Sequence, residues 1–370
     1  MDATRAARGG EATVRTLTAA PALGPLLLRG ALRSPLKRTP HTGAPLPGTR
    51  LVLPSARIDA RRLAAYAEVC GFPEPGPEVP LPLPYPHVPA FPLAMRVLTE
   101  RAFPLPVLGL VHTAIEVTRP GPPLLPGDRP ELSVHAAALV PHRRGTEVVV
   151  VTEARLDGEL VWESRSRYLA RHPVPPGSAP APGEPMTTEP APAEPATTDG
   201  GAERAVEWRL PGGLGRRYGS ASGDRNPIHL HPLTARLFGF PRAIAHGMWT
   251  FARCLAEADR QGGPELRGGQ PVAARAAFRA PVLLPGTVRC VLRDAGAGAT
   301  AFTLRSGDGR THLDGEARYG DVNGDEGEGP AGTAPGDRDL GPQGPTGAGS
   351  GSGSGTGSGD LSGGTSAPRA

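Results

Sequence analysis

Two short stretches, PPLLPGD at residues 122–128 and PVLLPGT at residues 281–287, share a Leu-Leu-Pro-Gly core and suggest that the chain contains one structural unit twice. Each stretch is followed by alternating apolar and polar residues that end at turn residues, the period-two pattern of half-buried antiparallel strands. Each set of strands ends in an arginine-tyrosine pair. The predicted strands cover residues 131–140, 146–156 and 159–170 in the first half, and 288–294, 299–306 and 310–319 in the second.

One helical stretch precedes each Leu-Leu-Pro-Gly core. The spacing of apolar residues predicts a helix over residues 90–103 and another over residues 243–260. Because Leu-Leu-Pro-Gly alone is a weak match, chance likeness is the alternative; the repeated order of helix, core, strands and Arg-Tyr favours duplication. A helix beside a curved antiparallel sheet buries its apolar face there. We therefore expect an α+β fold with two antiparallel sheets, each wrapping a central helix, as a pseudo-dimer within one chain.

Composition divides the chain around these two units. The 51 glycines and 46 prolines gather mainly in three segments with few apolar residues, a composition typical of linkers and disordered tracts. The expected organisation is a disordered N-terminal region at 1–48, a first unit at 49–172, a proline- and alanine-rich linker at 173–203, a second unit at 204–320, and a disordered glycine- and serine-rich tail at 321–370.

The charge distribution argues against a nucleic-acid partner. The formal net charge is +4, but basic residues gather in the first fifty residues and acidic residues in the last fifty. No stripe of basic and aromatic residues like that of a single-strand binder is present in the sequence. We expect no nucleic-acid binding.

Cysteine usage and hydropathy indicate the compartment. Cys70, Cys254 and Cys290 lie far apart in sequence and form no CxxC pair, so neither a disulfide framework nor a cysteine zinc site is expected. The early apolar run at 23–28 is too short for a signal peptide, and no run approaches the roughly 18 residues of a membrane span. We expect a soluble cytoplasmic protein with no membrane partner.

The stretch SGDRNPIHLHPLTARLFGF at residues 222–240 contains the candidate catalytic residues. Asn226-Pro227 forces a turn, because proline fixes its own φ and drives the preceding residue out of helical conformation. A short helix is expected from Pro232 to Gly239. The turn allows Asp224 and His229 to point into one space, as an acid and an imidazole that could move a proton.

His246-Gly247 stands at the start of the predicted long helix. A helix start offers free backbone N–H groups, and Gly247 allows a ligand to approach that backbone closely. An acid, an imidazole and such an oxyanion site suit proton removal next to a carbonyl, or addition of water across a conjugated double bond.

The run from Tyr218 to Ala235, with Ser222-Gly223-Asp224 and Asn226-Pro227-Ile228-His229, and the later Ala245-His246-Gly247-Met248 resemble the signature of the MaoC-like, R-specific enoyl-thioester hydratases, also called 3-hydroxyacyl-thioester dehydratases. That family has the hot-dog fold. The resemblance implies reversible conversion of a (3R)-3-hydroxyacyl thioester to a trans-2-enoyl thioester and water, in fatty-acid metabolism. The reaction that the resemblance implies requires no metal and no redox cofactor.

The resemblance also assigns roles to individual residues. Asp224 and His229 match the catalytic pair that activates water. The backbone N–H of Gly247 matches the oxyanion donor, with Asn226 and His246 at the same substrate-binding site. The motif residues Ser222, Gly223 and Pro227 support the turn. His231 departs from the family, because an acidic or amide side chain often stands there and caps a helix better.

The likeness extends to the fused form of the family, in which a first hot-dog unit has lost the signature. The stretch YPHVPAFPLAM at residues 85–95 enters the first predicted helix without the motif. In fused members the degenerate unit is thought to make room for the acyl tail. His87 and His112 could line such a channel, with core or surface packing as the alternative.

Other interpretations of the site residues stay open. Asp224 could simply cap the turn, His229 could be a satisfied core histidine, and Asn226 is more typical of a structural residue than of a catalytic one. His229, His231 and His246 with Asp224 could form a metal cluster, although His229 and His231 would point in opposite directions on a strand. We therefore expect no metal at this site.

Two other functions use the same residues. A hot-dog thioesterase would direct water to the thioester carbonyl, and a non-catalytic subunit would bind acyl thioesters or a partner enzyme. Arg216, Arg217 and Arg225 flank the motif and could pair with coenzyme A phosphates, with solvated surface as the alternative. The sequence does not decide between coenzyme A and acyl carrier protein as the carrier of the substrate. It also leaves open the length of the acyl chain and whether the protein forms a homodimer.

Overall fold

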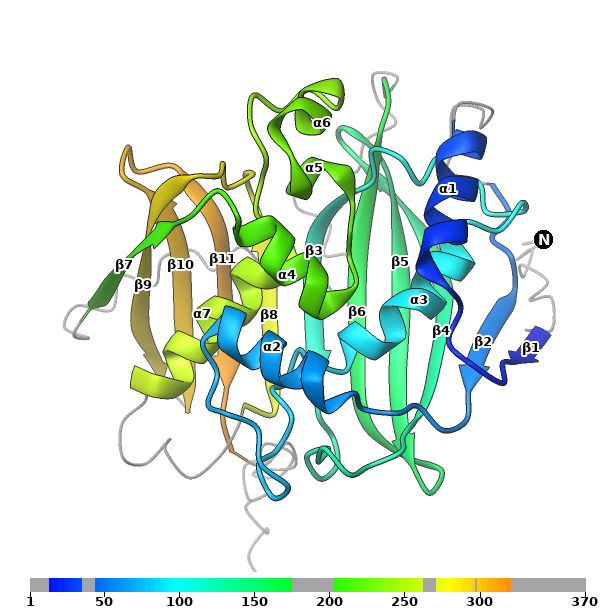
Figure 1. Cartoon of the computed structure of the whole chain (residues 1–370), viewed down its shortest axis with the longest axis horizontal. Helices are drawn as coiled ribbons and strands as arrows, with labels where there is room; N and C mark the ends of the chain where they lie inside the picture. Colours follow the sequence, from blue (N-terminus) through cyan, green and yellow to red (C-terminus); the bar gives the residue numbers. More distant parts are fainter. Residues whose placement is uncertain (1–12, 35–43, 175–202, 262–270, 297, 321–370) are drawn as a thin grey trace, which may run out of the picture. The chain divides into compact units, whose positions relative to one another are not determined.

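The computed structural model describes residues 13–34, 44–174, 203–261, 271–296 and 298–320. Helices lie on one face of a single mixed sheet (Figure 1). The predicted linker and tail fall almost entirely outside the described residues. Among the described residues, no helix combines the length and apolarity needed to cross a bilayer.

The strands follow the order β1-β2-β4-β5-β6-β3-β8-β11-β10-β9-β7 in one sheet. Apart from the parallel pair β1 and β2, neighbouring strands run antiparallel. The strands are β1 Thr13–Thr16, β2 Thr49–Leu53, β3 Val111–Thr118, β4 Glu131–His142, β5 Gly145–Leu156, β6 Glu159–Arg171, β7 Arg204–Leu210, β8 Ala273–Phe278, β9 Gly286–Gly296, β10 Ala299–Ser306 and β11 Thr311–Arg318. All six strands predicted from the period-two pattern are present, with bounds shifted by a few residues.

The expectation of two separate sheets is wrong. The two halves share a continuous sheet, because β3 of the first half pairs antiparallel with β8 of the second, from Ala114 opposite Ala277 to Thr118 opposite Ala273. The main-chain hydrogen bonds of this pair satisfy strand groups that would otherwise be left unpaired at the junction. The fold class is α+β, with helices packed on one face of a mainly antiparallel sheet.

Both predicted central helices are present, but their bounds differ by a few residues from the predicted ones. α3 His87–Leu98 packs on β4 and β5, and α7 Gly247–Gln261 packs on β10 and β11. The predicted start of α7 at residue 243 is wrong, because residues 243–246 are extended. There the N–H of Ala245 donates to the carbonyl of Val282 at 2.9 Å, and the N–H of Leu284 donates to the carbonyl of Ala243 at 2.8 Å.

The second Leu-Leu-Pro-Gly core therefore has a defined role, which is to hold the segment that leads into α7. The first core does the same for the segment before α3, since the N–H of Leu81 donates to the carbonyl of Leu124 at 2.7 Å. These pairings fix where each central helix begins.

Two helices that the sequence pattern did not predict pack against each other where the halves meet. They are α2 Ala60–Cys70 and α4 Leu214–Ser222. The indole N–H of Trp249 on α7 donates to the carbonyl of Val69 at 2.8 Å, and Arg217 pairs with Glu68 at 2.8 Å. These contacts join the two halves on the helical side of the sheet.

The expectation of disorder over residues 1–48 is wrong for residues 13–34. Besides β1, this segment forms α1 Leu23–Arg33, which contacts α3. Leu26 is buried, and the hydroxyl of Ser34 donates to the carbonyl of Gly30 and accepts from the N–H of Leu108. Burial of Leu26 against the first unit contributes stabilisation that the composition of the segment did not indicate.

Asp259, near the end of α7, is expected to make stability depend on pH. Burial raises the pKa of its carboxyl to about 6 from 3.8, opposed by the hydroxyl of Tyr319, which donates to Oδ1 at 2.8 Å. As pH rises, the Asp259 carboxyl therefore loses its proton in the unfolded chain before it does so in the folded protein. The free energy of unfolding consequently falls between about pH 4 and pH 6. This cost is constant above pH 6 and reaches at most about 3 kcal/mol, at about 1.4 kcal/mol per pKa unit.

Asp259→Asn keeps the acceptor for Tyr319 and removes the charge. We expect the variant to be about 1–3 kcal/mol more stable than the wild type at pH 7.5 and equal to it at pH 4, in urea unfolding. The same substitution at exposed Asp294 is the control. Equal stability of the Asp259 variant and the wild type at both pH values would contradict the assignment.

Candidate active site

The turn that carries Asp224 is organised by side chains of the motif itself. α4 ends at Ser222, and Gly223 follows with φ of 84°, a conformation that favours glycine. The hydroxyl of Ser222 donates to the carbonyl of Tyr218 at 2.9 Å and accepts from the N–H of Asp224 at 3.2 Å. Oδ1 of Asp224 in turn accepts from the N–H of Asn226 at 3.1 Å.

Asn226 caps a short helix inside the turn, α5 Pro227–Leu230, with Pro227 at its first position. Oδ1 of Asn226 accepts from the N–H of Ile228 at 3.4 Å. The second short helix, α6 Pro232–Leu237, matches the predicted one, and Gly239 follows it with φ of 83°. His231 caps α6 through Nδ1, which accepts from the N–H of Leu233 at 3.1 Å.

His229 is buried at the end of α5, and its tautomer is set by a main-chain contact. Nδ1–H donates to the carbonyl of Ile244 at 2.8 Å, which leaves Nε2 with its lone pair. Burial lowers the pKa of His229 below its ordinary value, opposed by the nearby carboxylate of Asp224. The imidazole is therefore neutral at pH 7 and can accept a proton at Nε2.

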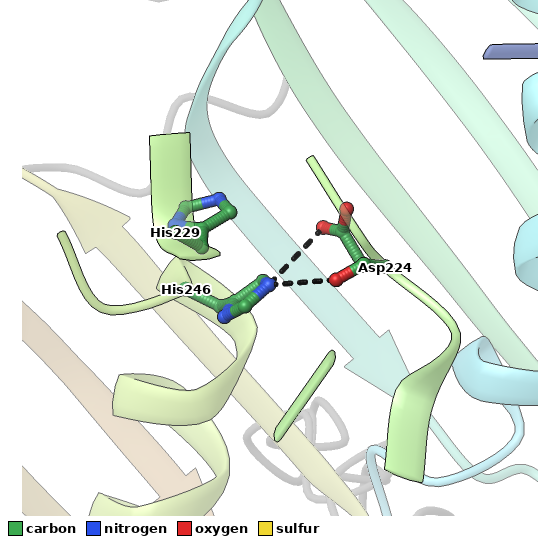
Figure 2. Close-up of side chains that lie close together, drawn as sticks. All are labelled: Asp224, His229 and His246. Carbon is green, nitrogen blue, oxygen red and sulfur yellow. Dashed lines mark hydrogen bonds and ion pairs between the residues drawn. The ribbon is translucent and has the colours of Figure 1, made fainter. Parts of the chain in front are cut away.

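His246 contacts both Asp224 and His229. Its Nε2–H donates to the carbonyl of Asp224 at 3.0 Å and lies 3.9 Å from Oδ2 of the same residue (Figure 2). Its ring stacks on that of His229 with centroids 3.7 Å apart. Burial, followed by the neighbouring His229, lowers the pKa of His246 to about 3, so this ring is neutral too.

The three side chains could also be considered as metal ligands, since one ligand atom from each of Asp224, His229 and His246 lies within 4.8 Å of the others. Nδ1 of His229 and Nε2 of His246 already donate to carbonyl groups. The nitrogens that keep a lone pair for a metal are therefore Nε2 of His229 and Nδ1 of His246.

Gly247 is the first residue of α7, where backbone N–H groups have no partner within the helix. A Cβ atom at this position would lie 3.2–3.5 Å from ring atoms of Phe278. The helix start is therefore close to β8. A side chain at this position would crowd that ring, so glycine keeps the helix start clear.

A cavity of about 720 Å³ connects these residues to the first half of the chain. Asp224, His229, His246 and Gly247 border it from the second half, and Val88, Phe91, Met95 and Leu98 of α3 border it from the first. The volume lies within the range of small-molecule sites. The carboxylate of Asp224 is 28% exposed, so it can be reached from this cavity.

Two glycines on one face of α4, neither of them predicted as a site residue, allow the turn with Asp224 and His229 to pack closely. A Cβ at Gly215 would lie 1.9 Å from the carbonyl oxygen of His229, and one at Gly219 would lie 2.7 Å from the carbonyl oxygen of Asp224. Their spacing of four residues places them on the same helix face. It is a sequence signal that becomes informative only once α4 is known to be a helix.

The flanking arginines have different surroundings. Arg216 donates to the carbonyl of Leu230 at 3.0 Å, and Arg217 is paired with Glu68. Arg225 borders the cavity. Of the three candidates for contact with a phosphate group, Arg225 is thus the one that faces the site.

Comparison with known proteins gives consistent matches. Residues 213–315 match the MaoC like domain. The chain is 33% identical over 280 residues to 3-hydroxyacyl-thioester dehydratase X of Mycobacterium tuberculosis, covering 76% of this chain and 91% of that protein. The crystal structure of HtdX from the same organism matches with a TM-score of 0.59 at 31% identity, covering 73% of this chain and 99% of that one.

The fold also matches a MaoC-like dehydratase from Phytophthora capsici, with a TM-score of 0.59 at 19% identity, covering 76% of this chain and 97% of that one. At this identity the likeness concerns the fold alone, and it identifies the α+β architecture as hot-dog-like. The match to the mycobacterial protein spans both halves. The chain belongs to the MaoC-like dehydratase family, a family of hydro-lyases.

Proposed function

We propose that the protein interconverts trans-2-enoyl thioesters and (3R)-3-hydroxyacyl thioesters by adding or removing water. The observation that carries this proposal is the arrangement around the cavity. The Asp224 carboxylate, the imidazole of His229 and Gly247 at the start of α7 border the same cavity. The related mycobacterial protein, which is named a 3-hydroxyacyl-thioester dehydratase, supports the same reaction class.

In the hydration direction, one water molecule would lie between the Asp224 carboxylate and Nε2 of His229. As Nε2 takes a proton from this water, the oxygen forms a bond to C3 and the C2=C3 π electrons move towards the thioester carbonyl. The N–H of Gly247 stabilises the negative charge that gathers on the thioester carbonyl oxygen. C2 then receives a proton from the catalytic pair, so water has added and the protein is unchanged.

Dehydration follows the same steps in reverse. The pair removes the proton from C2, the negative charge gathers on the thioester oxygen, and the hydroxyl group on C3 leaves as water after it has received a proton. His229 can alternate between the two proton states, because its Nδ1–H stays bonded to Ile244 throughout. His246 would hold the Asp224 backbone in place through its Nε2–H.

The first half would hold the acyl tail. Its contribution to the cavity includes Phe91 and Met95 on α3 and Leu27 and Leu28 on α1. Apolar side chains suit methylene groups, each of which gains about 0.8 kcal/mol on burial. We therefore propose residues 49–172 as a degenerate hot-dog unit that binds the chain, and residues 204–320 as the catalytic unit of an internal pseudo-dimer.

The substrate would be carried on coenzyme A or on acyl carrier protein. The test is the loss of enoyl-thioester ultraviolet absorbance when the purified protein is added to trans-2-enoyl thioesters of increasing length, carried on coenzyme A and then on acyl carrier protein. Loss without release of free thiol is expected. Thiol release would instead identify a thioesterase, and no change with either carrier would favour a subunit that only binds acyl thioesters.

A further inference from the structure

Two histidines of the first half border the cavity beside the catalytic pair. His87 is the first residue of α3, and His112 lies on β3. Their rings are nearly parallel at an angle of 11°, with centroids 6.5 Å apart. The ring of Tyr168 stacks on His112 with centroids 4.5 Å apart. We call His87 and His112 the histidine pair.

Each ring of the histidine pair has a nitrogen without a hydrogen-bond partner among the described residues, Nδ1 in His87 and Nε2 in His112. The side chain of His87 is enclosed, since the residue is only 8% exposed. Buried polar atoms nearly always have a partner, so two unpartnered nitrogens beside one cavity require an explanation. Because χ2 of histidine varies broadly, a modest ring rotation would present these atoms to a ligand.

The histidine pair stands on the path that an acyl chain would take. Phe278 lies against Gly247 on one side, and its ring centroid lies 4.8 Å from that of His112 on the other. His87 comes next, followed one and two turns later on α3 by Phe91 and Met95. A chain that leaves the reacting carbons at Gly247 thus passes polar rings before it reaches the apolar wall.

The surroundings of the pair favour an uncharged ligand group. Burial lowers the pKa of His87 to about 4 and that of His112 to about 3, so both rings are neutral and each offers one donor and one acceptor. The nearby guanidinium of Arg167 is already 3.8 Å from the carboxylate of Glu147, which also accepts from the hydroxyl of Thr113. A hydroxyl or keto oxygen matches this wall better than a carboxylate does.

We propose that His87 and His112 form a specificity subsite for an oxygen function on the acyl chain, a hydroxyl or keto group placed beyond the reacting double bond. This inference rests on the proposed function. A chain of methylenes would leave the ring nitrogens without partners, whereas an oxygen function would satisfy them. A site built to hydrogen-bond a substrate group discriminates against the analogue that lacks it.

The test compares trans-2-decenoyl-coenzyme A with matched analogues that carry one hydroxyl group on successive carbons beyond the double bond. For the wild type, kcat/KM is expected to be about fivefold to tenfold higher for at least one hydroxylated chain, the gain of one net hydrogen bond. His87→Leu and His112→Leu are expected to abolish this preference and to raise kcat/KM for the plain chain. Phe91→Leu is the matched control and should alter both substrates alike.

Binding of the saturated hydroxyacyl and plain acyl thioesters to the wild type, measured by calorimetry, gives the same comparison without any variant. A wild type that prefers the plain chain for every hydroxyl position would overturn the subsite while leaving the hydration activity in place. A preference that survives in both leucine variants would overturn it as well. Failure to hydrate the plain chain would instead reject the proposed function, and this inference with it.

Discussion

Asp224→Asn is expected to lower kcat for hydration by about 10²–10⁴-fold, the usual contribution of a positioned acid or base. Asparagine has the same shape, and its Oδ1 can still accept the N–H of Asn226 that shapes the turn. The substitution therefore removes the negative charge and the proton acceptor without removing the local structure. Loss of enoyl-thioester absorbance under saturating substrate is the measurement.

His229→Gln should have an effect of similar size, because the ring nitrogen that faces the site is lost. When residues act on one proton as a unit, the double variant is no slower than the slower single one. Asp157→Asn, in an exposed turn where φ of 50° is tolerated by asparagine, is the control and should retain full activity. Folded Asp224→Asn protein with most of its activity would refute the role of this carboxylate.

Gly215→Ala is expected to reduce kcat/KM by about 10²-fold although Gly215 has no part in the chemistry. The added Cβ would lie 1.9 Å from the carbonyl oxygen of His229 and 2.9 Å from its carbonyl carbon, so α5 must move away from α4. A displacement of about 1 Å in a catalytic group is enough for a loss of this size. Overpacking should also destabilise the fold by about 1–3 kcal/mol, read from urea unfolding.

Gly212→Ala is the matched control for this effect. Its Cβ would meet only Cδ of Pro285, at 3.7 Å, an ordinary van der Waals contact. Both activity and stability should stay near those of the wild type. If Gly215→Ala were as active as Gly212→Ala, displacement of α5 from α4 would not affect the reaction. Close packing of α5 against α4 would then not be what positions His229.

The site could be predicted from the sequence further than the fold could. Asp224 and His229 are close in sequence, Pro227 restricts the backbone between them, and Gly223 permits the positive φ before Asp224. A motif alone therefore brings the two side chains to one cavity. His246 and Gly247 were found for a similar reason. They stand at a helix start, where the physical properties of the backbone are known in advance.

The features that were missed depend on long-range packing. β8 reads AARAAF, which has no β-branched residue and a single aromatic one, Phe278, and it becomes a strand through pairing with β3 and β11. α1 follows the same rule, since its contact with α3 joins residues that are far apart in sequence. Propensity and composition do not contain such contacts, and tertiary structure overrides them.

The pairing of β3 with β8 has a consequence for how such a chain can be shortened. A chain that ended before β7 would leave β3 as an edge strand, with a row of N–H and C=O groups open to any extended segment. Such a fragment would be expected to associate with other copies of itself or to aggregate. Duplication within one chain thus keeps the partner strand at a fixed high local concentration, and self-association through this edge is avoided during synthesis as soon as β8 has formed.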